Sequence, residues 1–220
     1  IVQVFKQMSD VYADGERVYA QAGALLSKTA AVACEASLTG MEFASGIPGT
    51  LGGALRMNAG AYGGEMKQIV ESAEVLTSEG EVLNLTNEEL GMGYRTSVIA
   101  KNDYVALSAV LKLEKGDRQE IRAYMEDLKE RRVTKQPLEF GSAGSTFKRP
   151  EGYFAGKLIQ DSGMQGYRVG DAQVSEKHCG FVINRGNATA AEVMQLMKDV
   201  ADRVEEKFGV RLEPEVRRIG

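Results

Sequence analysis

The first feature with chemical potential is a dense run of glycines between residues 46 and 53. It reads Gly-Ile-Pro-Gly-Thr-Leu-Gly-Gly, and a second glycine cluster follows between residues 58 and 64. Glycine lets the backbone approach a ligand closely and adopt positive φ. The amides beyond Pro48 could open a short helix at Thr50, whose positive N-terminal end attracts a diphosphate. The run indicates a site for a cofactor with a pyrophosphate; a purely structural turn is the alternative.

The familiar nucleotide-binding motifs do not occur in this segment. The chain has neither G-x-G-x-x-G after a strand nor G-x-x-x-x-G-K-[ST]. A dinucleotide at this loop would therefore bind by neither the Rossmann nor the P-loop route.

Three polar residues stand in settings where they could act on a ligand. Arg95 lies in a turn after a hairpin, Ser145 in a loop of small residues, and Glu215 after a proline near the C-terminal end. Each also has an ordinary interpretation, as surface charges for Arg95 and Glu215 and as a turn serine bonding its own backbone for Ser145. Taken singly, none of them reveals a function.

Histidine and cysteine are too sparse for the commonest hydrolytic and metal sites. His178 is the only histidine, and Cys34 and Cys179 lie far apart with no C-x-x-C spacing. A Ser-His-Asp triad, a zinc site and a disulfide framework are therefore poor interpretations, and no metal is expected. Cys34 lies in an alanine-rich stretch and is expected in the core.

In the first half, short strands and hairpins must position these residues. Residues 11–13 and 17–20 alternate around Asp14-Gly15, which predicts a hairpin. The pattern also predicts a helix over 24–38, a second hairpin of 69–76 and 81–85, and a strand over 104–113. Residues 1–5 read as a strand with no lead-in, so the chain is expected to begin in mid-domain.

The second half contains the stronger helical patterns. A boundary is expected near 115–117, before a helix over 118–132 whose apolar face is Ile121, Tyr124, Met125 and Leu128. A short helix over 154–160 and a buried strand over 181–183 follow. Thr189 and Glu192 form a capping-box pair that opens a last helix. Its apolar stripe is Val193, Leu196, Met197, Val200, Val204 and Phe208, and Gly209 ends it.

Composition narrows the class of protein. The chain has 220 residues, 43% hydrophobic and 26% charged, with a net charge of −4. It has no apolar run long enough for a transmembrane helix and no basic excess for nucleic acid. The cysteine usage favours a reducing cytoplasm, and no obligate protein partner is indicated.

Together, the motifs resemble those of one enzyme family. Residues 45–54 with 57–63 are similar to the flavin-site signature of the UDP-N-acetylenolpyruvoylglucosamine reductases, the MurB family. Tyr94-Arg95-Thr96-Ser97, Gly144-Ser145-Thr146-Phe147-Lys148 and Glu213-Pro214-Glu215-Val216-Arg217 resemble its three catalytic segments in order, and residues 155–160 also match. The resemblance covers essentially the whole chain.

The resemblance implies an FAD-dependent, NADPH-consuming reductase. Hydride passes from NADPH to FAD and then to the enolpyruvyl group of UDP-N-acetylglucosamine enolpyruvate, which gives UDP-N-acetylmuramate for peptidoglycan synthesis. By resemblance, Arg95 stabilises the substrate carboxylate, Ser145 protonates the substrate carbon, and Glu215 completes the polarising set. Tyr94, Lys135 and Lys157 are implied to bind substrate, while the roles of Lys148 and Arg149 stay open. The implied FAD-binding residues are Gly46, Ile47, Pro48, Gly49, Thr50, Gly52, Gly53, Asn58, Ala59 and Gly60.

The implied fold is α+β in two domains. Residues 1–115 would form the C-terminal portion of an FAD-binding domain of the vanillyl-alcohol-oxidase type, and residues 116–220 a smaller α+β substrate-binding domain. The resemblance implies that an N-terminal subdomain of about 70 to 90 residues, with another FAD-binding glycine loop, is missing from this chain. Two alternatives to the reductase stay open. One is a fragment that binds the nucleotide-sugar but cannot hold FAD. The other is a flavin oxidase of the same superfamily with another substrate.

Overall fold

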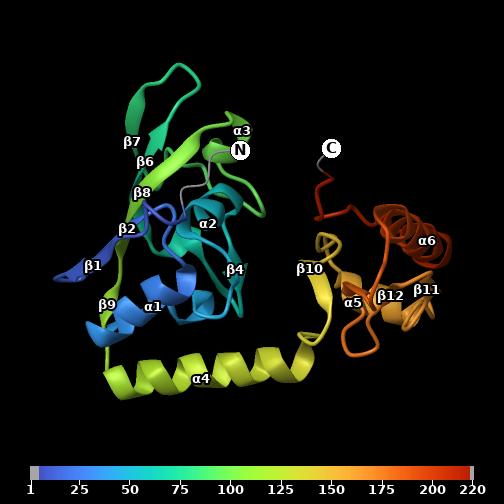
Figure 1. Ribbon diagram of the computed structural model, residues 1–220. Helices are drawn as coiled ribbons and strands as arrows, with labels where there is room; N and C mark the ends of the chain where they lie inside the picture. The colour runs from blue at the N-terminus through green and yellow to red at the C-terminus, as the bar shows by residue number, and fades with distance from the viewer. Residues whose placement is uncertain (1–4, 219–220) are drawn as a thin grey trace. The chain divides into compact units, whose positions relative to one another are not determined.

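The computed structural model describes residues 5–218 and divides the chain into two compact units (Figure 1). Unit 1 comprises residues 1–131 and unit 2 residues 132–220. The expected strand over 1–5 lies outside the described residues except for Phe5, which lies in a turn. The two-domain boundary after residue 115 stays a prediction. The mixed composition of helices and strands confirms the predicted α+β class.

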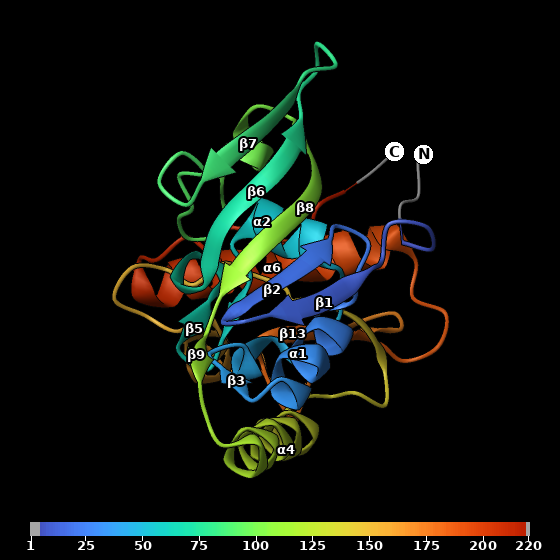
Figure 2. The ribbon, with the colours of Figure 1, turned by 90° about the vertical axis from the view of Figure 1, so that its left-hand side faces the viewer.

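Unit 1 is built on a five-stranded antiparallel sheet with the order β1-β2-β8-β6-β7. Its strands are β1 Val11–Asp14, β2 Arg17–Gln21, β6 Val70–Leu76, β7 Val82–Thr86 and β8 Val105–Lys112. Helices α1 (Leu26–Glu35) and α2 (Leu51–Met57) lie on one face of this sheet (Figures 1 and 2). The smaller elements are β3 Leu38–Thr39, η1 Glu42–Ala44, β4 Gly60–Ala61, β5 Gly64–Glu65, η2 Met66–Gln68, α3 Val98–Lys101 and β9 Glu114–Lys115.

The two faces of the sheet differ as the strand alternation requires. Leu111 on β8 is fully buried and pairs with Val18 on β2 and Val70 on β6. On the exposed side, Arg17 and Glu71 form an ion pair of 2.7 Å between Nε and Oε2. The apolar face under α1 and α2 is therefore the core of unit 1.

Unit 2 has a four-stranded sheet and its own core. The sheet order is β10-β13-β12-β11, and α5 and α6 pack with it around the second hydrophobic cluster. Its elements are β10 Gly141–Ser145, α5 Ala155–Asp161, β11 Arg168–Val169, β12 Ala172–Val174, β13 Phe181–Asn184 and α6 Ala190–Phe208. Helix α4 (Arg118–Lys135) contains the point at which the two units divide.

Several predicted elements are confirmed with small corrections. The capping box of Thr189 and Glu192 is present at the start of α6, although Phe208 at its end is exposed. Tyr124 was predicted on the apolar face of α4 but is 46% exposed, because the buried contacts of that helix come from Ile121 and Leu128. The first hairpin turns at residues 15–16 instead of 14–15, since Asp14 pairs with Arg17 and Gly15 takes the positive φ.

Candidate functional site

The glycine loop of unit 1 joins η1 to α2 and is fixed by its backbone. Leu26 N–H donates to Gly49 O at 3.1 Å, and the amides of Leu51 and Gly52 donate to Ala24 O and Ala22 O, both at 2.8 Å. The predicted short helix after Pro48 is confirmed as α2. Two of the amides expected to face a diphosphate are instead used to hold the loop against residues 22–26. A bound diphosphate must therefore use other donors.

Gly52 and Gly53 are adjacent in α2 but have different surroundings. A Cβ at Gly52 would stand 3.1 Å from Ala22 Cβ and 3.2 Å from Ala22 O, so packing explains its small size. A Cβ at Gly53 would meet only Thr50 Oγ1, at 4.0 Å, and Gly53 is exposed. Packing therefore does not explain the absence of a side chain at Gly53, which leaves a bare surface on α2.

The segment after α2 returns along the same region. Asn58 ends α2 in the left-handed conformation with φ +44°, and its side chain is buried. Ala59 N–H donates to Ala54 O at 2.9 Å, and Gly60 pairs with Glu65 in the β4–β5 ladder. All ten predicted cofactor-binding residues thus lie in the continuous stretch formed by the loop, α2 and β4.

Tyr94 and Arg95 occupy a tight turn in unit 1. Gly93 and Thr96 exchange both backbone hydrogen bonds, at 3.0 and 3.2 Å, which closes the turn. Arg95 has φ +54°, and its guanidinium carbon lies 5.3 Å from the centre of the Tyr94 ring. Left-handed backbone at a residue other than glycine costs roughly 1 kcal/mol or more and clusters at functional sites. The conformation thus supports the prediction that Arg95 belongs to a functional site.

Ser145 is exposed at the end of β10, where the strand is irregular. It pairs with Phe181, but the register shifts between Ser142 and Ser145, and Gly144 has φ +87°. Bulges of this kind re-aim a side chain relative to its ladder. The small residues of 141–145 therefore form strand β10 instead of the expected loop.

Glu215 is brought into the segment that follows Ser145 by backbone pairing within unit 2. Phe147 and Pro214 form an isolated antiparallel bridge, and Glu215 N–H donates to Thr146 O at 2.9 Å. Lys148 N–H donates to Glu213 O at 2.8 Å. These bonds place Glu215 opposite the residue next to Ser145. Tyr94 and Arg95 belong to the other unit.

The basic residues predicted near the substrate are distributed over α4, α5 and the segment between β10 and α5. Lys135 is the last residue of α4, and Lys157 in the first turn of α5 forms an ion pair with Asp161. Lys148 pairs with Glu213 at 3.0 Å. The Arg149 guanidinium carbon lies 4.0 Å from the centre of the exposed Phe154 ring. Sequence reasoning gave no role to Phe154, since a lone aromatic before a helix has no distinguishing pattern.

His178 supports the Ser145 strand instead of offering a catalytic base. Its Nδ1 accepts from Gly180 N–H at 3.1 Å, and Gly180 O accepts from Thr146 N–H at 2.9 Å. Burial lowers the pKa of His178 below its ordinary 6.5, and the charge of Lys135 lowers it further. In residues 5–218, no group of three or more histidine, cysteine, aspartate or glutamate side chains could hold a metal.

We expect His178 to make the protein sensitive to mild acid. Because its pKa is lower in the folded protein, the unfolded chain takes up the proton first when the pH falls below 6.5. The stabilisation is complete above that pH and is lost as the pH falls through the lower folded pKa. The free energy of unfolding should thus fall less between about pH 7.5 and 5.5 in His178→Gln than in the parent. Urea titrations at both pH values measure this change. An equal decrease in the free energy of unfolding in the variant and in the parent would contradict the prediction.

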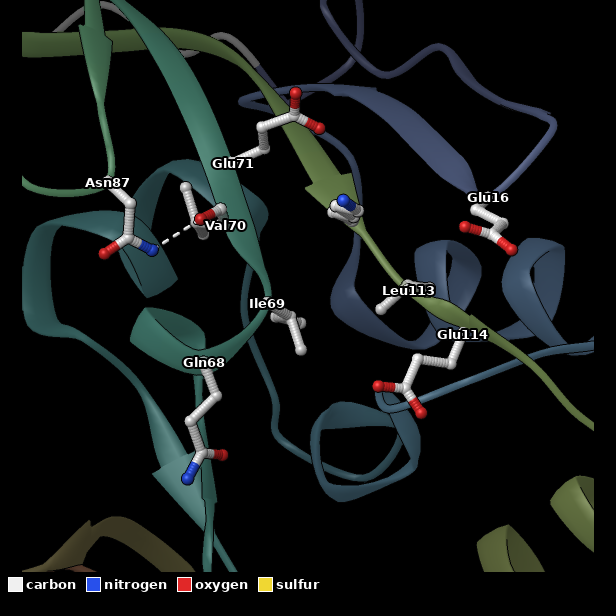
Figure 3. A pocket seen from close by; sticks show the side chains of 9 residues that line it. Glu16, Gln68, Ile69, Val70, Glu71, Asn87, Leu113 and Glu114 are labelled. Atoms are coloured by element: carbon white, nitrogen blue, oxygen red, sulfur yellow. Dashed lines mark hydrogen bonds between the residues drawn. The ribbon is translucent and has the colours of Figure 1, made fainter.

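A hollow of about 590 Å³ lies elsewhere in unit 1 (Figure 3). Its lining includes the carboxylates of Glu16, Glu71 and Glu114, together with Lys112 and Asn87. It contains none of the predicted site residues, and its acidic lining is unsuited to an anionic dinucleotide. We therefore do not assign the cofactor to it.

Comparisons with known proteins identify the family of this chain. Residues 1–86 match the family model of an FAD binding domain, and residues 136–219 match that of the UDP-N-acetylenolpyruvoylglucosamine reductase C-terminal domain. The UDP-N-acetylenolpyruvoylglucosamine reductase of Alkaliphilus oremlandii (strain OhILAs) is 59% identical over all 220 residues, which cover 72% of that protein. The chain belongs to this reductase family. Its assignment confirms the predicted type of fold, FAD as the cofactor and an oxidoreductase as the class of enzyme.

Two further relatives show what share of the length of a family member this chain spans. The reductase of Agathobacter rectalis is 59% identical over 203 residues, 92% of this chain and 65% of that protein. The crystal structure of UDP-N-acetylenolpyruvylglucosamine reductase (MurB) from Thermus caldophilus is similar with a TM-score of 0.79 and 38% identity, over 90% of this chain and 71% of the other. The chain thus spans about two thirds of the length of these relatives. Within residues 5–218, none of the helices has both the length and the apolar character needed to span a membrane.

Proposed function

We propose that the protein containing this chain reduces UDP-N-acetylglucosamine enolpyruvate to UDP-N-acetylmuramate, a step of peptidoglycan synthesis in the cytoplasm. The observation that carries the proposal is the backbone pairing in unit 2, because it brings Glu215 opposite Thr146, the residue that follows Ser145. The family of the relatives supports the same reaction.

The residues of unit 1 fit the FAD expected at the glycine loop. Gly53 presents bare, exposed backbone on α2, and Gly49 has φ +144° with open space around its Cβ position. A flat cofactor can approach such backbone closely. When bound, FAD supplies a hydride that it has received from NADPH.

The side chains of this chain have distinct tasks in the proposed reaction. Hydride addition to one alkene carbon moves the π electrons to the other carbon and into the adjacent carboxylate. Arg95 binds that carboxylate and stabilises the developing charge. The Ser145 hydroxyl donates its proton to the second carbon, which balances the reduction, and Glu215 orients or polarises the donor. Tyr94, Lys135 and Lys157 bind the nucleotide-sugar.

An FAD titration of the purified chain tests whether the cofactor site is present. Saturable quenching of flavin fluorescence with a shifted visible spectrum would support the proposal. The alternative outcome is that the chain alone binds no FAD. In that case a titration with UDP-N-acetylglucosamine would distinguish a fragment that binds the nucleotide-sugar from a protein that binds neither ligand.

The adjacent glycines of α2 provide a matched pair of variants. Gly52→Ala should destabilise unit 1 by about 1–3 kcal/mol, because its Cβ crowds Ala22. Gly53→Ala should stabilise the exposed helix by about 0.5–1 kcal/mol and yet weaken FAD binding, because the new methyl group occupies the bare surface. Chemical denaturation and FAD titration of both variants measure this. Unchanged FAD affinity in Gly53→Ala would remove Gly53 from the site.

A further inference from the structure

We infer that Asn58 is a positioning residue, which holds the Arg95 turn in register with the flavin segment. The inference rests on the proposed function, since it assigns Asn58 an effect on the reaction through Arg95. By resemblance Asn58 would contact the cofactor, but the hydrogen bonds of its side chain point into the protein.

The Asn58 side chain joins three segments of unit 1. Its Nδ2 donates to Gly93 O at 3.1 Å and to Glu65 Oε2 at 3.0 Å, while its Oδ1 accepts from Lys67 N–H at 2.9 Å. Both amide hydrogens are thus used, and the residue is only 2% exposed. The amide therefore connects the end of α2 with the β5–η2 segment and with the first residue of the Arg95 turn.

The bond to Gly93 acts directly on the turn. Gly93 O also accepts from Thr96 N–H at 3.2 Å, so one carbonyl oxygen receives both the bond that closes the turn and the bond from Asn58. Arg95 lies between Gly93 and Thr96 with φ +54°. A residue in this uncommon conformation stays there only when its surroundings determine it.

The far end of the turn is anchored to the same helix. Ser97 Oγ donates to Arg56 O at 2.9 Å, and Arg56 in turn donates to Ile99 O at 3.1 Å. Asn58 and Arg56 thus tie both ends of the turn to the last residues of α2. Because α2 also carries Gly52 and Gly53, the Arg95 turn and the proposed flavin surface are joined through one helix.

Few residues can replace Asn58 in this arrangement. The position requires φ +44°, which asparagine, aspartate and glycine tolerate best. It also requires two donors and one acceptor in a buried place, which the amide supplies and a carboxylate does not. Aspartate would place an acceptor against Glu65 Oε2 and Gly93 O, and glycine would keep the backbone while removing all three bonds.

The first test measures the turn itself in protein without added FAD. Hydrogen exchange of a peptide that contains residues 93–96 should become about tenfold faster in Asn58→Asp and Asn58→Gly, because the turn loses a buried hydrogen bond. Asn87→Ala is the matched control. Asn87 also donates two amide hydrogen bonds, to Lys67 O and Val70 O (Figure 3). Its replacement by alanine removes these bonds to the η2 region but removes no bond to the turn. Exchange of 93–96 should stay unchanged in Asn87→Ala.

The second test separates the two half-reactions in FAD-loaded protein. Reduction of the flavin by NADPH should change less than about twofold in Asn58→Asp, whereas its reoxidation by the enolpyruvyl substrate should slow about tenfold. In an Arg95→Lys background the same change should add less than about twofold, because Asn58 acts through Arg95. A purely structural role would instead affect both half-reactions and the Asn87→Ala control alike.

The outcomes separate the inference from the proposed function. If Arg95→Lys leaves reoxidation unaffected, the proposed role of Arg95 fails. If Arg95→Lys slows reoxidation but both Asn58 variants keep parent exchange at 93–96 and parent reoxidation, the positioning role of Asn58 is overturned while the proposed function stands.

Discussion

Ser145→Ala is expected to lower the rate of enolpyruvyl reduction by about 10²–10⁴-fold, the usual contribution of a positioned proton donor. Reduction of bound flavin by NADPH should stay at the parent rate, because the role proposed for Ser145 belongs to the other half-reaction. Reduced flavin should therefore accumulate in the presence of both substrates. Stopped-flow absorbance of the flavin band measures the two rates in one experiment.

Ser142→Ala is the control for this variant. Ser142 lies on the same strand, β10, and its hydroxyl donates to Val182 O at 2.9 Å. Its replacement should alter the local backbone without removing the proton donor, so we expect less than about a threefold change in reoxidation. Parent rates in Ser145→Ala would exclude the serine as the donor and would turn attention to Glu215 or a bound water.

The second large effect is expected in the core of unit 1. Leu111→Ala removes a fully buried side chain between Val18 and Val70, which should lower the free energy of unfolding by about 2–5 kcal/mol. Domains are stable by only about 5–15 kcal/mol, so this is a large share. Urea unfolding followed by far-ultraviolet circular dichroism measures the loss.

Val105→Ala tests whether burial is the cause. Val105 begins the same strand but is 49% exposed, so the same kind of truncation should cost less than about 0.5–1 kcal/mol. Equal losses for the two variants would contradict the assignment of Leu111 to the core and would indicate that strand propensity dominates at β8.

Local patterns predicted most elements because their causes are local. The capping box of Thr189 and Glu192, the apolar stripe of α6 and the helix after Pro48 depend on residues within a few positions of one another. The corrected features depend on partners elsewhere in the chain. Whether Tyr124 is buried depends on what packs against α4, and the turn of the first hairpin depends on the pairing of Asp14 with Arg17.

The candidate site shows the same limit more sharply. Spacing alone could not reveal that Glu215 lies opposite Thr146, since about 70 residues separate them along the chain and only a backbone hydrogen bond in the folded protein joins them. Nor could it reveal that the Asn58 amide donates a hydrogen bond to Gly93 O, in the turn that contains Arg95. The resemblance named these residues as a set, but their roles within the set depend on contacts that only the fold supplies.

The order of strands in unit 1 has a consequence for synthesis on the ribosome. Strand β8 is the middle strand of the sheet, yet it is the last of the five to emerge, after both the β1–β2 and the β6–β7 hairpins. An isolated hairpin is marginally stable in water. At a rate of synthesis of about 5–20 residues per second, the nascent chain thus spends seconds with the edges of β2 and β6 unpaired, because both strands pair with β8. Chaperones should therefore bind the nascent chain most strongly in this interval. A chain that terminates before residue 112 should keep these strand edges unpaired.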